Sequence, residues 1–332
     1  MFARWLQRQW FEQRRLTPAL WLLLPAAALF WLLASLRRRL IAPQRLPVPV
    51  VVVGNITIGG SGKTPLVLWL AECLRERGWR PGIVSRGYGS AGATPRPVDA
   101  ASSHAEVGDE PLLLVRRGSA PVWVGRDRAA AGRALLAAHP EVDLLLCDDG
   151  LQHYRLARDV ELAVFDGRGA GNGCLLPAGP LREPLARLRT VDAVICNGAV
   201  DPRLRANTRR FAMHLRPGPF YRLDRPDLTC AAEELAGRRL HALAGIGDPE
   251  RFFRTLEALG LDFSRHPFPD HHAYSAADLA FAAAGTLLMT EKDAVKCAAL
   301  TAREAWVLPV EAELPLALVE LIEEKIRGRP LA

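Results

Sequence analysis

The feature that most constrains the fold of this chain is a glycine-rich segment placed between an apolar strand and a helix. The β-branched run Val50–Val53 comes first and is typical of a buried parallel strand. Residues 65–77 follow the segment, have the apolar spacing of a helix and end at Gly78. This order predicts a phosphate-binding loop. Its residues are Thr57, Ile58, Gly59, Gly60, Ser61, Gly62, Lys63 and Thr64.

The chemistry of this loop follows from its residue types. Glycines let backbone amides approach phosphate oxygens, and the helix N-terminus adds a partial positive charge. Lys63 would reach the β- and γ-phosphates, and the Thr64 hydroxyl would bind Mg²⁺. The strict motif has glycine at position 57, where this chain has Thr57, so Gly59 and Gly60 would supply the flexibility instead. A chance Gly-Lys-Thr in a turn is the alternative, which the flanking strand and helix disfavour.

Two acidic residues, Asp148 and Asp149, end the apolar run Leu144–Cys147. An acid at the end of a strand, across from a phosphate loop, holds the Mg²⁺ shell in many nucleotide-binding proteins. The alternative is a solvated pair of turn acids before Gly150. Together with the phosphate loop, the pair predicts a Mg²⁺ site, to which Glu110 is a further candidate ligand.

A phosphotransferase acting on an alcohol also needs a group that accepts the hydroxyl proton. Asp109, in the turn Gly108–Pro111, is the candidate base, although an Asp in such a turn is often only a helix cap. His271 follows Asp270 and is a candidate partner for that carboxylate. A histidine on a surface loop is an equally good interpretation from the sequence alone.

The alternation of short strands and helices predicts an α/β fold with a doubly wound parallel sheet, similar to that of P-loop NTPases. We expect residues 46–166 to form this P-loop kinase core. A Gly/Pro-rich stretch follows, so residues 167–315 are expected to form a second, smaller α/β lobe that contributes His271 to the cleft. Residues 316–332 would form a C-terminal helix and tail.

The N-terminal residues 1–45 differ from the rest of the chain in charge and hydropathy. Residues 16–36 are 21 residues without a charge, and as a helix they would be about 31 Å long, close to the roughly 30 Å of a bilayer's hydrocarbon. Arginines flank this stretch, and no cleavage site follows it, which disfavours a signal peptide. We therefore expect residues 1–45 to be an arginine-flanked membrane-anchoring helix, either spanning the bilayer or lying in one leaflet.

The net charge of +7 does not indicate a nucleic-acid-binding protein. Residues 1–45 hold eight arginines and one acid, which leaves 35 basic and 35 acidic residues in the remainder of the chain. The excess charge is therefore confined to the N-terminal segment and suits an anionic membrane surface. We expect no nucleic-acid partner, and no obligatory protein partner is evident.

Taken together, the motifs resemble those of the tetraacyldisaccharide 4'-kinase family of lipid A biosynthesis. The matching segments are residues 53–65, 85–89, 108–111, 148–153, 176–183 and 290–296. The resemblance implies an enzyme that transfers the γ-phosphate of ATP, with Mg²⁺, to the 4'-hydroxyl of tetraacyldisaccharide 1-phosphate. It also implies a place at the bacterial inner membrane, with the catalytic domain facing the cytoplasm and the lipid disaccharide as substrate.

The resemblance also implies roles for single residues. Asp109 corresponds to the family's base and His271 to its assisting histidine, although His272 is adjacent. Arg86, Tyr88 and Arg182 lie in matching motifs and are expected to contact substrate or nucleotide phosphates.

Two other functions fit parts of the sequence. A membrane-tethered P-loop regulatory ATPase or GTPase is one, but the chain lacks the Asn/Thr-Lys-x-Asp guanine signature, and Ile58 stands where partitioning ATPases carry a lysine. A membrane-tethered binding module with a vestigial loop is the other. It would have no need for Asp109.

Overall fold

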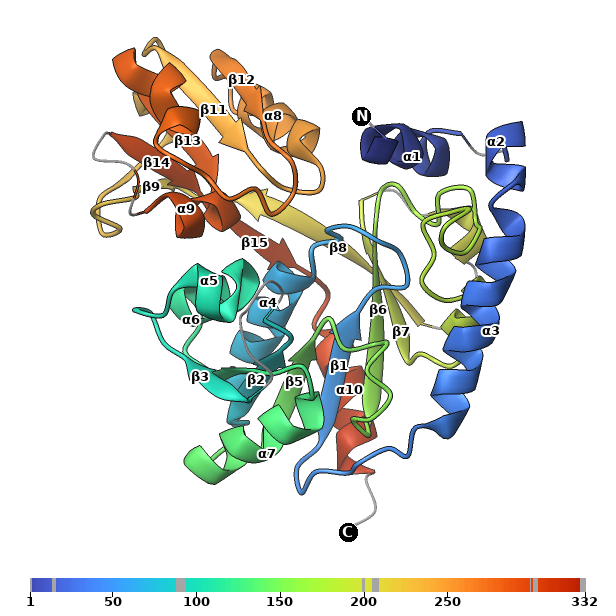
Figure 1. Ribbon diagram of the computed structural model, residues 1–332. Coiled ribbons are helices and arrows are strands. Elements are labelled where there is room, and N and C mark those ends of the chain that lie inside the picture. The colour runs from blue at the N-terminus through green and yellow to red at the C-terminus, as the bar shows by residue number, and fades with distance from the viewer. Residues whose placement is uncertain are drawn as a thin grey trace.

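The computed structural model describes residues 2–13, 16–87, 94–198, 201–204, 209–298, 300 and 304–328. These residues form two α/β lobes, each built on its own sheet (Figure 1). The expected α/β class with a large parallel sheet is therefore confirmed.

The larger sheet has nine strands within the described residues. Seven are parallel, and an antiparallel strand lies at each edge. In spatial order the strands are β15 (Val310–Glu313), β8 (Arg209–Pro217), β7 (Ala193–Asn197), β6 (Val160–Asp166), β1 (Val50–Gly54), β5 (Leu144–Asp148), β2 (Pro81–Ser85), β4 (Val122–Val124) and β3 (Arg96–Val98).

Helices cover the faces of this sheet, which explains the uninterrupted apolar run of β1. Every residue of β1 is buried, because separate apolar cores lie on the two faces of the sheet. The helices of the larger lobe are α4 (Lys63–Glu76), α5 (His104–Val107), α6 (Asp109–Arg117), α7 (Arg128–Ala138) and α10 (Ala317–Arg327), with the 3₁₀ turns η1 (Leu185–Arg189) and η2 (Pro202–Leu204).

The smaller lobe has a six-stranded sheet within the described residues. Its order is β10 (Thr229–Cys230), β9 (Phe220–Arg222), β14 (Ala305–Leu308), β13 (Thr286–Thr290), β11 (Leu240–Ala244) and β12 (Phe263–Pro267). Its helical elements are α8 (Pro249–Ala258), α9 (Glu291–Cys297) and the 3₁₀ turns η3 (Ala232–Glu234) and η4 (Ala277–Ala284).

The chain passes between the lobes twice, from β8 to β9 and from β14 to β15. The Gly218 amide donates to the Pro309 carbonyl at 3.0 Å, which joins the two crossings. Both β7 and β8 lie in the larger sheet, and α10 packs against α4 in the same lobe. A division at residue 166 therefore does not coincide with the division between the two sheets.

The N-terminal segment does not form the continuous helix expected over residues 16–36. It forms α1 (Phe2–Phe11), α2 (Pro18–Trp21) and α3 (Leu24–Leu40), and α3 lies along the outside of the larger lobe (Figure 1). Pro18 and Pro25 each occupy the first turn of a helix, where proline is tolerated, so the segment divides before Leu24. No helix in the described ranges is both long enough and apolar enough to cross a membrane. The continuous helix expected over residues 16–36 was wrong, and a helix that lies in one leaflet remains a prediction.

Candidate active site

The phosphate loop lies where the sequence predicts it, between the end of β1 and the start of α4. Gly59 and Gly62 have φ angles of 95° and 91°, a left-handed conformation that favours glycine. An ideal Cβ on Gly62 would lie 2.6 Å from the Asn197 amide nitrogen. That amide donates to the Ser61 carbonyl at 3.1 Å, and the Asn55 amide donates to the Gly59 carbonyl at 3.1 Å. Two buried asparagines therefore fix the path of the loop.

Lys63 extends from this loop to the end of β5. Its ammonium lies 3.5 Å from the Asp149 carboxylate, which Arg182 also approaches at 3.4 Å. Burial raises the pKa of Asp149, but Lys63 and Arg182 outweigh this effect and lower it to about 2. Asp149 also has a φ of 48°, which is uncommon outside glycine and clusters at functional sites.

Asp148 has no such partners. Its carboxylate is fully buried, and neither oxygen has a hydrogen-bond partner among the described residues. Burial, followed by the charge of Glu110, raises the pKa of Asp148 to about 7. The Ser61 hydroxyl nearby in the loop is also without a partner in the part of the chain described. A buried, unsatisfied carboxylate beside a phosphate loop fits a divalent cation.

The cation would not be enclosed by protein ligands alone. Within the described residues, no group of three His, Cys, Asp or Glu side chains is arranged to hold a metal ion. Mg²⁺ ordinarily binds through one or two carboxylates and substrate phosphates. The predicted ligands Thr64, Asp148, Asp149 and Glu110 fit that pattern better than they fit a closed protein site.

Asp109 and His271 come together from different lobes. The Nδ1 atom of His271 lies 3.1 Å from Oδ2 of Asp109, which is buried at the start of α6. Burial opposes ionisation of Asp109, but the hydrogen bond from His271 and the charge of Lys292 lower its pKa below the usual value. The same hydrogen bond raises the pKa of His271. His271 has a φ of 57°, so the turn that presents it is strained.

The neighbouring histidine is directed elsewhere. His272 Nε2 lies 3.4 Å from Asp278, and its ring packs against Phe268 and Tyr274. The structure therefore places His271, not His272, against Asp109.

Lys292 forms a second contact between the lobes. Its ammonium pairs with the Glu110 carboxylate, next to Asp109. Burial disfavours the charged ammonium, but Glu110 and Asp109 outweigh this and raise the pKa of Lys292. No role for Lys292 was predicted from the sequence. The one sequence feature that could have indicated a role is that the chain has only four lysines. Two of them, Lys63 and Lys292, line the same cleft between the lobes.

The cleft between the lobes has a volume of about 190 Å³. Lys63, Thr64 and Glu110 line it from the larger lobe, and Arg251, Phe252 and Lys292 line it from the smaller one.

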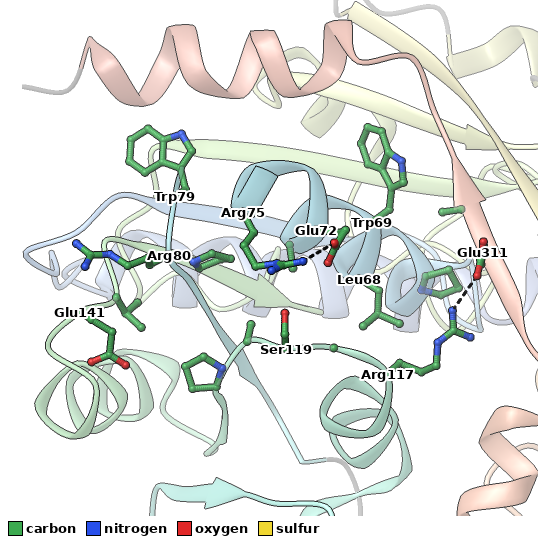
Figure 2. A pocket seen from close by; sticks show the side chains of 18 of the residues that line it. Leu68, Trp69, Glu72, Arg75, Trp79, Arg80, Arg117, Ser119, Glu141 and Glu311 are labelled. Carbon is green, nitrogen blue, oxygen red and sulfur yellow. Dashed lines mark hydrogen bonds and ion pairs between the residues drawn. The ribbon is translucent and has the colours of Figure 1, made fainter. Parts of the chain in front are cut away.

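A larger cavity of about 460 Å³ lies on the outer side of α4 (Figure 2). Trp69, Trp79 and Arg75 lie along its wall, and none of the residues predicted for the site lines it. Two of its cations are paired: Arg75 with Glu72, three residues earlier on α4, and Arg117 with Glu311 of β15 (Figure 2).

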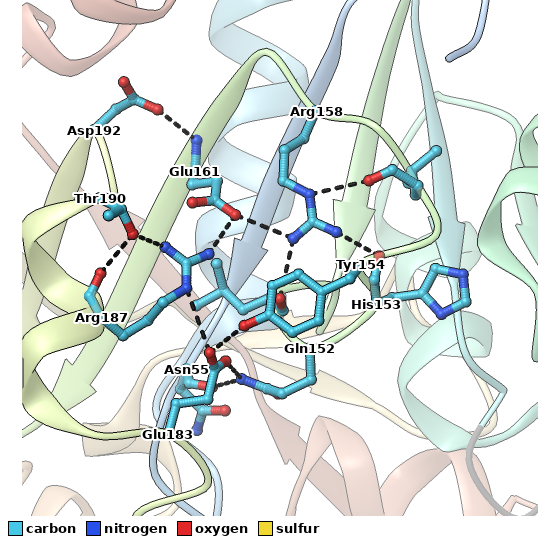
Figure 3. A network of polar contacts seen from close by, with 12 residues as sticks. Asn55, Gln152, His153, Tyr154, Arg158, Glu161, Glu183, Arg187, Thr190 and Asp192 are labelled. Atoms are coloured by element: carbon cyan, nitrogen blue, oxygen red, sulfur yellow. Dashed lines mark hydrogen bonds and ion pairs between the residues drawn. The ribbon is translucent and has the colours of Figure 1, made fainter. Parts of the chain in front are cut away.

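A largely buried polar network contacts Asn55, which leads into the phosphate loop (Figure 3). The Gln152 amide donates to the Asn55 carbonyl at 3.0 Å and to the Glu183 carboxylate at 2.7 Å. Its oxygen accepts a hydrogen bond from Arg182 at 3.3 Å. The Tyr154 hydroxyl also donates to Glu183, which Arg187 approaches at 3.4 Å. The network thus connects Arg182 and the start of the phosphate loop to the core.

The three predicted substrate contacts, Arg86, Tyr88 and Arg182, differ in where they lie. Arg86 is exposed, one residue beyond the end of β2, and Tyr88 lies outside the described residues. Arg182 is in the site, through its contacts with Asp149 and Gln152. Asn197 and Arg251 were not predicted, because no local motif marks them.

Comparisons with known proteins agree on one family. The model of the tetraacyldisaccharide-1-P 4'-kinase family matches residues 19–327. The tetraacyldisaccharide 4'-kinase of Dechloromonas aromatica (strain RCB) is 68% identical and covers 100% of both chains. The protein of the same name from Azoarcus sp. (strain BH72) is 53% identical over 95% of this chain and 94% of its own.

A solved structure is also similar. The crystal structure of LpxK from Aquifex aeolicus in complex with ATP is 29% identical, with a TM-score of 0.79, and the match covers 93% of this chain and 99% of that chain. Family model, relatives and solved structure each extend over nearly the whole chain. The chain therefore belongs to the tetraacyldisaccharide 4'-kinase family.

Proposed function

We propose that this protein is an ATP-dependent kinase that phosphorylates the 4'-hydroxyl of tetraacyldisaccharide 1-phosphate in lipid A biosynthesis. One observation carries the proposal beyond family membership. Lys63 of the phosphate loop faces a cleft that Glu110 and Lys292 also line, and Asp109 with His271 lies directly beside Glu110. A triphosphate site and a base for an alcohol therefore adjoin one another.

We infer that the larger lobe is a nucleotide-binding core with a P-loop-NTPase-like, doubly wound sheet. We also propose that the smaller lobe contributes His271 to the cleft. The backbone amides of residues 57–64 would surround the α- and β-phosphates of ATP, and the Lys63 ammonium would reach the β- and γ-phosphates. Gly59 and Gly62 of this loop have left-handed φ angles, a conformation that favours glycine.

Mg²⁺ would be held by the Thr64 hydroxyl and the Asp148 carboxylate, with Asp149 and Glu110 adjacent. When bound, it supplies neutralisation of charge on the β- and γ-phosphate oxygens. Asp149 and Glu110 also form the ion pairs that orient Lys63 and Lys292 towards the cleft.

Asp109 would accept the proton of the 4'-hydroxyl as that oxygen attacks the γ-phosphorus. His271 would orient the Asp109 carboxylate through the hydrogen bond at Nδ1 and keep it ionised. Arg182, held by Gln152 next to Asp149, is proposed to contact phosphate oxygens. Arg86 and Tyr88 remain proposed substrate contacts on the strength of their motif.

We further infer that the protein acts on the inner membrane, with its catalytic lobes in the cytoplasm, where ATP is supplied. A stripe of apolar side chains runs along one side of α3, and three arginines lie in the last turn of the same helix. Its members are half or more exposed, and each lies three or four residues from at least one other member: Leu29, Leu32, Leu33, Leu36 and Leu40. A lipid substrate is costly to remove from a bilayer, so the enzyme must come to it.

Membrane binding can be tested with the double variant L32S/L36S. Removing two apolar side chains should weaken binding to vesicles that contain anionic lipid by about tenfold or more, because each buried leucine contributes about 1.5–3 kcal/mol. L228S, an exposed leucine of the smaller lobe, is the control. Equal vesicle binding by the two variants would exclude α3 as the docking surface.

The kinase activity can be tested with γ-labelled ATP, Mg²⁺ and a panel of glucosamine lipids. We expect label only in the tetraacylated disaccharide 1-phosphate, at its 4' position. Label in a simple sugar would reject the lipid substrate. Nucleotide hydrolysis without lipid labelling would favour a regulatory ATPase.

A further inference from the structure

The cleft contains a cation that has no carboxylate partner. Three cations line it: Lys63, Lys292 and Arg251. Lys63 pairs with Asp149, and Lys292 pairs with Glu110. Arg251, on the first turn of α8, forms no ion pair with any carboxylate in the described ranges, and its guanidinium instead donates to the side chain of a neutral residue.

That neutral residue connects Arg251 to the phosphate loop. Nη2 of Arg251 donates to Oδ1 of Asn197 at 3.1 Å. The amide nitrogen of Asn197 then donates to the Ser61 carbonyl, also at 3.1 Å. A guanidinium from the smaller lobe is thus held two hydrogen bonds away from the loop that would surround the phosphates.

The segment before α8 lies close to the same loop. An ideal Cβ on Gly247 would be 3.2 Å from the backbone nitrogen of Gly60. The absence of a side chain at position 247 therefore lets the smaller lobe approach the phosphate-binding amides. Arg251 follows one turn later on the helix that this segment begins.

The charge of Arg251 is only partly compensated. Burial lowers its pKa, and the charges of Asp166 and Asp248 offset part of that effect. A guanidinium nevertheless stays protonated at neutral pH. A partly desolvated positive charge is costly until an anion compensates it, and a guanidinium matches phosphate oxygens in two-point geometry.

We propose that Arg251 binds the α- and β-phosphates of the nucleotide, from the side of the cleft opposite the phosphate loop. The proposal rests on the function proposed above, which makes ATP the nucleotide. A phosphate loop encloses the α- and β-phosphates, which ADP retains. Arg251 is connected through Asn197 to the Ser61 carbonyl and so lies next to these groups. Arg251 therefore binds substrate ATP and product ADP alike.

The test is the dissociation constant of Mg·ADP and Mg·ATP, measured by calorimetry on the full-length protein. R251Q should raise both constants by about tenfold or more, which corresponds to about 1.4 kcal/mol. R251K keeps a positive charge and should recover part of this loss. R254Q is the matched control and should bind as the wild type does, because Arg254 is exposed on the same helix and pairs with Asp248 at 3.8 Å.

Three results would overturn the proposal. Binding of Mg·ADP by R251Q within twofold of the wild type would exclude the contact. An unchanged ADP constant with a raised KM for the lipid would assign Arg251 to the lipid phosphate instead. Equal losses in R251Q and R251K, with equally lowered melting temperatures, would assign it a structural role.

The function proposed for the whole protein fails in a different way. A wild-type protein that binds Mg·ADP but labels no lipid would reject the lipid substrate and leave the role of Arg251 standing.

Discussion

The His271 imidazole and the Asp109 carboxylate lie 162 residues apart in the sequence and on different lobes, with Nδ1 3.1 Å from Oδ2. Two ion pairs join the same helix, α6, to the smaller lobe: Glu110 with Lys292, and Arg117 with Glu291 at 2.7 Å. Both ends of α6 are therefore fixed against α9. The position of the proposed base depends on how the two lobes are arranged.

The first prediction concerns the pH dependence of H271Q. The hydrogen bond from His271 lowers the pKa of Asp109, so its removal should raise that pKa. A base must be ionised, and activity is lost as pH falls through its pKa. The acidic limb of the kcat/KM profile should therefore move to higher pH in H271Q. H272Q should leave the limb in place, because His272 faces Asp278. Coincident profiles for H271Q and the wild type would contradict the pairing.

The second prediction contrasts the two acids at the end of β5 in Mg²⁺-free protein. The pKa of Asp148 is raised to about 7, so its burial destabilises the fold increasingly as pH rises from about 4 to 7. The pKa of Asp149 is lowered to about 2, so it stabilises the fold above about pH 4 and loses this effect as pH falls towards 2. At pH 8, D148N should unfold at a higher denaturant concentration than the wild type and D149N at a lower one. The same direction of change in both would refute the contrast.

The third prediction concerns the polar network formed around Glu183 and Arg187. Arg187 is 4% exposed and pairs with Glu161 and Glu183. In R187M the Glu183 carboxylate would stay buried without its cation, and Glu161 would keep only Arg158, which should lower the free energy of unfolding by about 3–5 kcal/mol. R189A, at an exposed position of the same 3₁₀ turn, should change it by less than about 0.5 kcal/mol. Urea denaturation compares the two, and similar values would show that the buried pairs contribute little.

The fourth prediction compares two glycines with almost the same backbone conformation. Gly62 has a φ of 91° and Gly78 a φ of 90°. A Cβ on Gly62 would meet the Asn197 amide at 2.6 Å, whereas nothing lies within 4 Å of a Cβ on Gly78. Both alanine variants should lose about 1–2 kcal/mol of stability from the left-handed conformation. Only G62A should also lose ATP affinity, and normal ATP binding by G62A would show that the loop tolerates displacement.

Short-range patterns predicted the position of the glycine-rich loop and of the carboxylates beside it. The loop 57–64 was recognisable because a strand, glycines and a helix adjoin in sequence. Asp148 was recognisable because β1 and β5 pair in parallel, with Val53 beside Asp148, so both strands end at one edge of the sheet. Such relations depend on a few neighbouring residues and on the rules of parallel sheets.

Contacts between the lobes could not be predicted in the same way. Lys292, Asn197 and Arg251 belong to three different elements, and their roles follow from how the smaller lobe lies on the larger one. The prediction of one continuous helix over residues 16–36 was wrong for a local reason. Pro25 lies in the first turn of a new helix, where proline is tolerated, and not in the interior of a longer one.

The role of Asp109 as the base is tested most directly by comparing D109N with the wild type in lipid phosphorylation and in Mg·ATP binding. A general base contributes about 10²–10⁴-fold to the rate, so kcat should fall by that factor. The dissociation constant for Mg·ATP should stay within about threefold of the wild-type value, because the proposed base would contact the acceptor and not the nucleotide. A D109N enzyme that labels the 4' position at the wild-type rate would contradict the account.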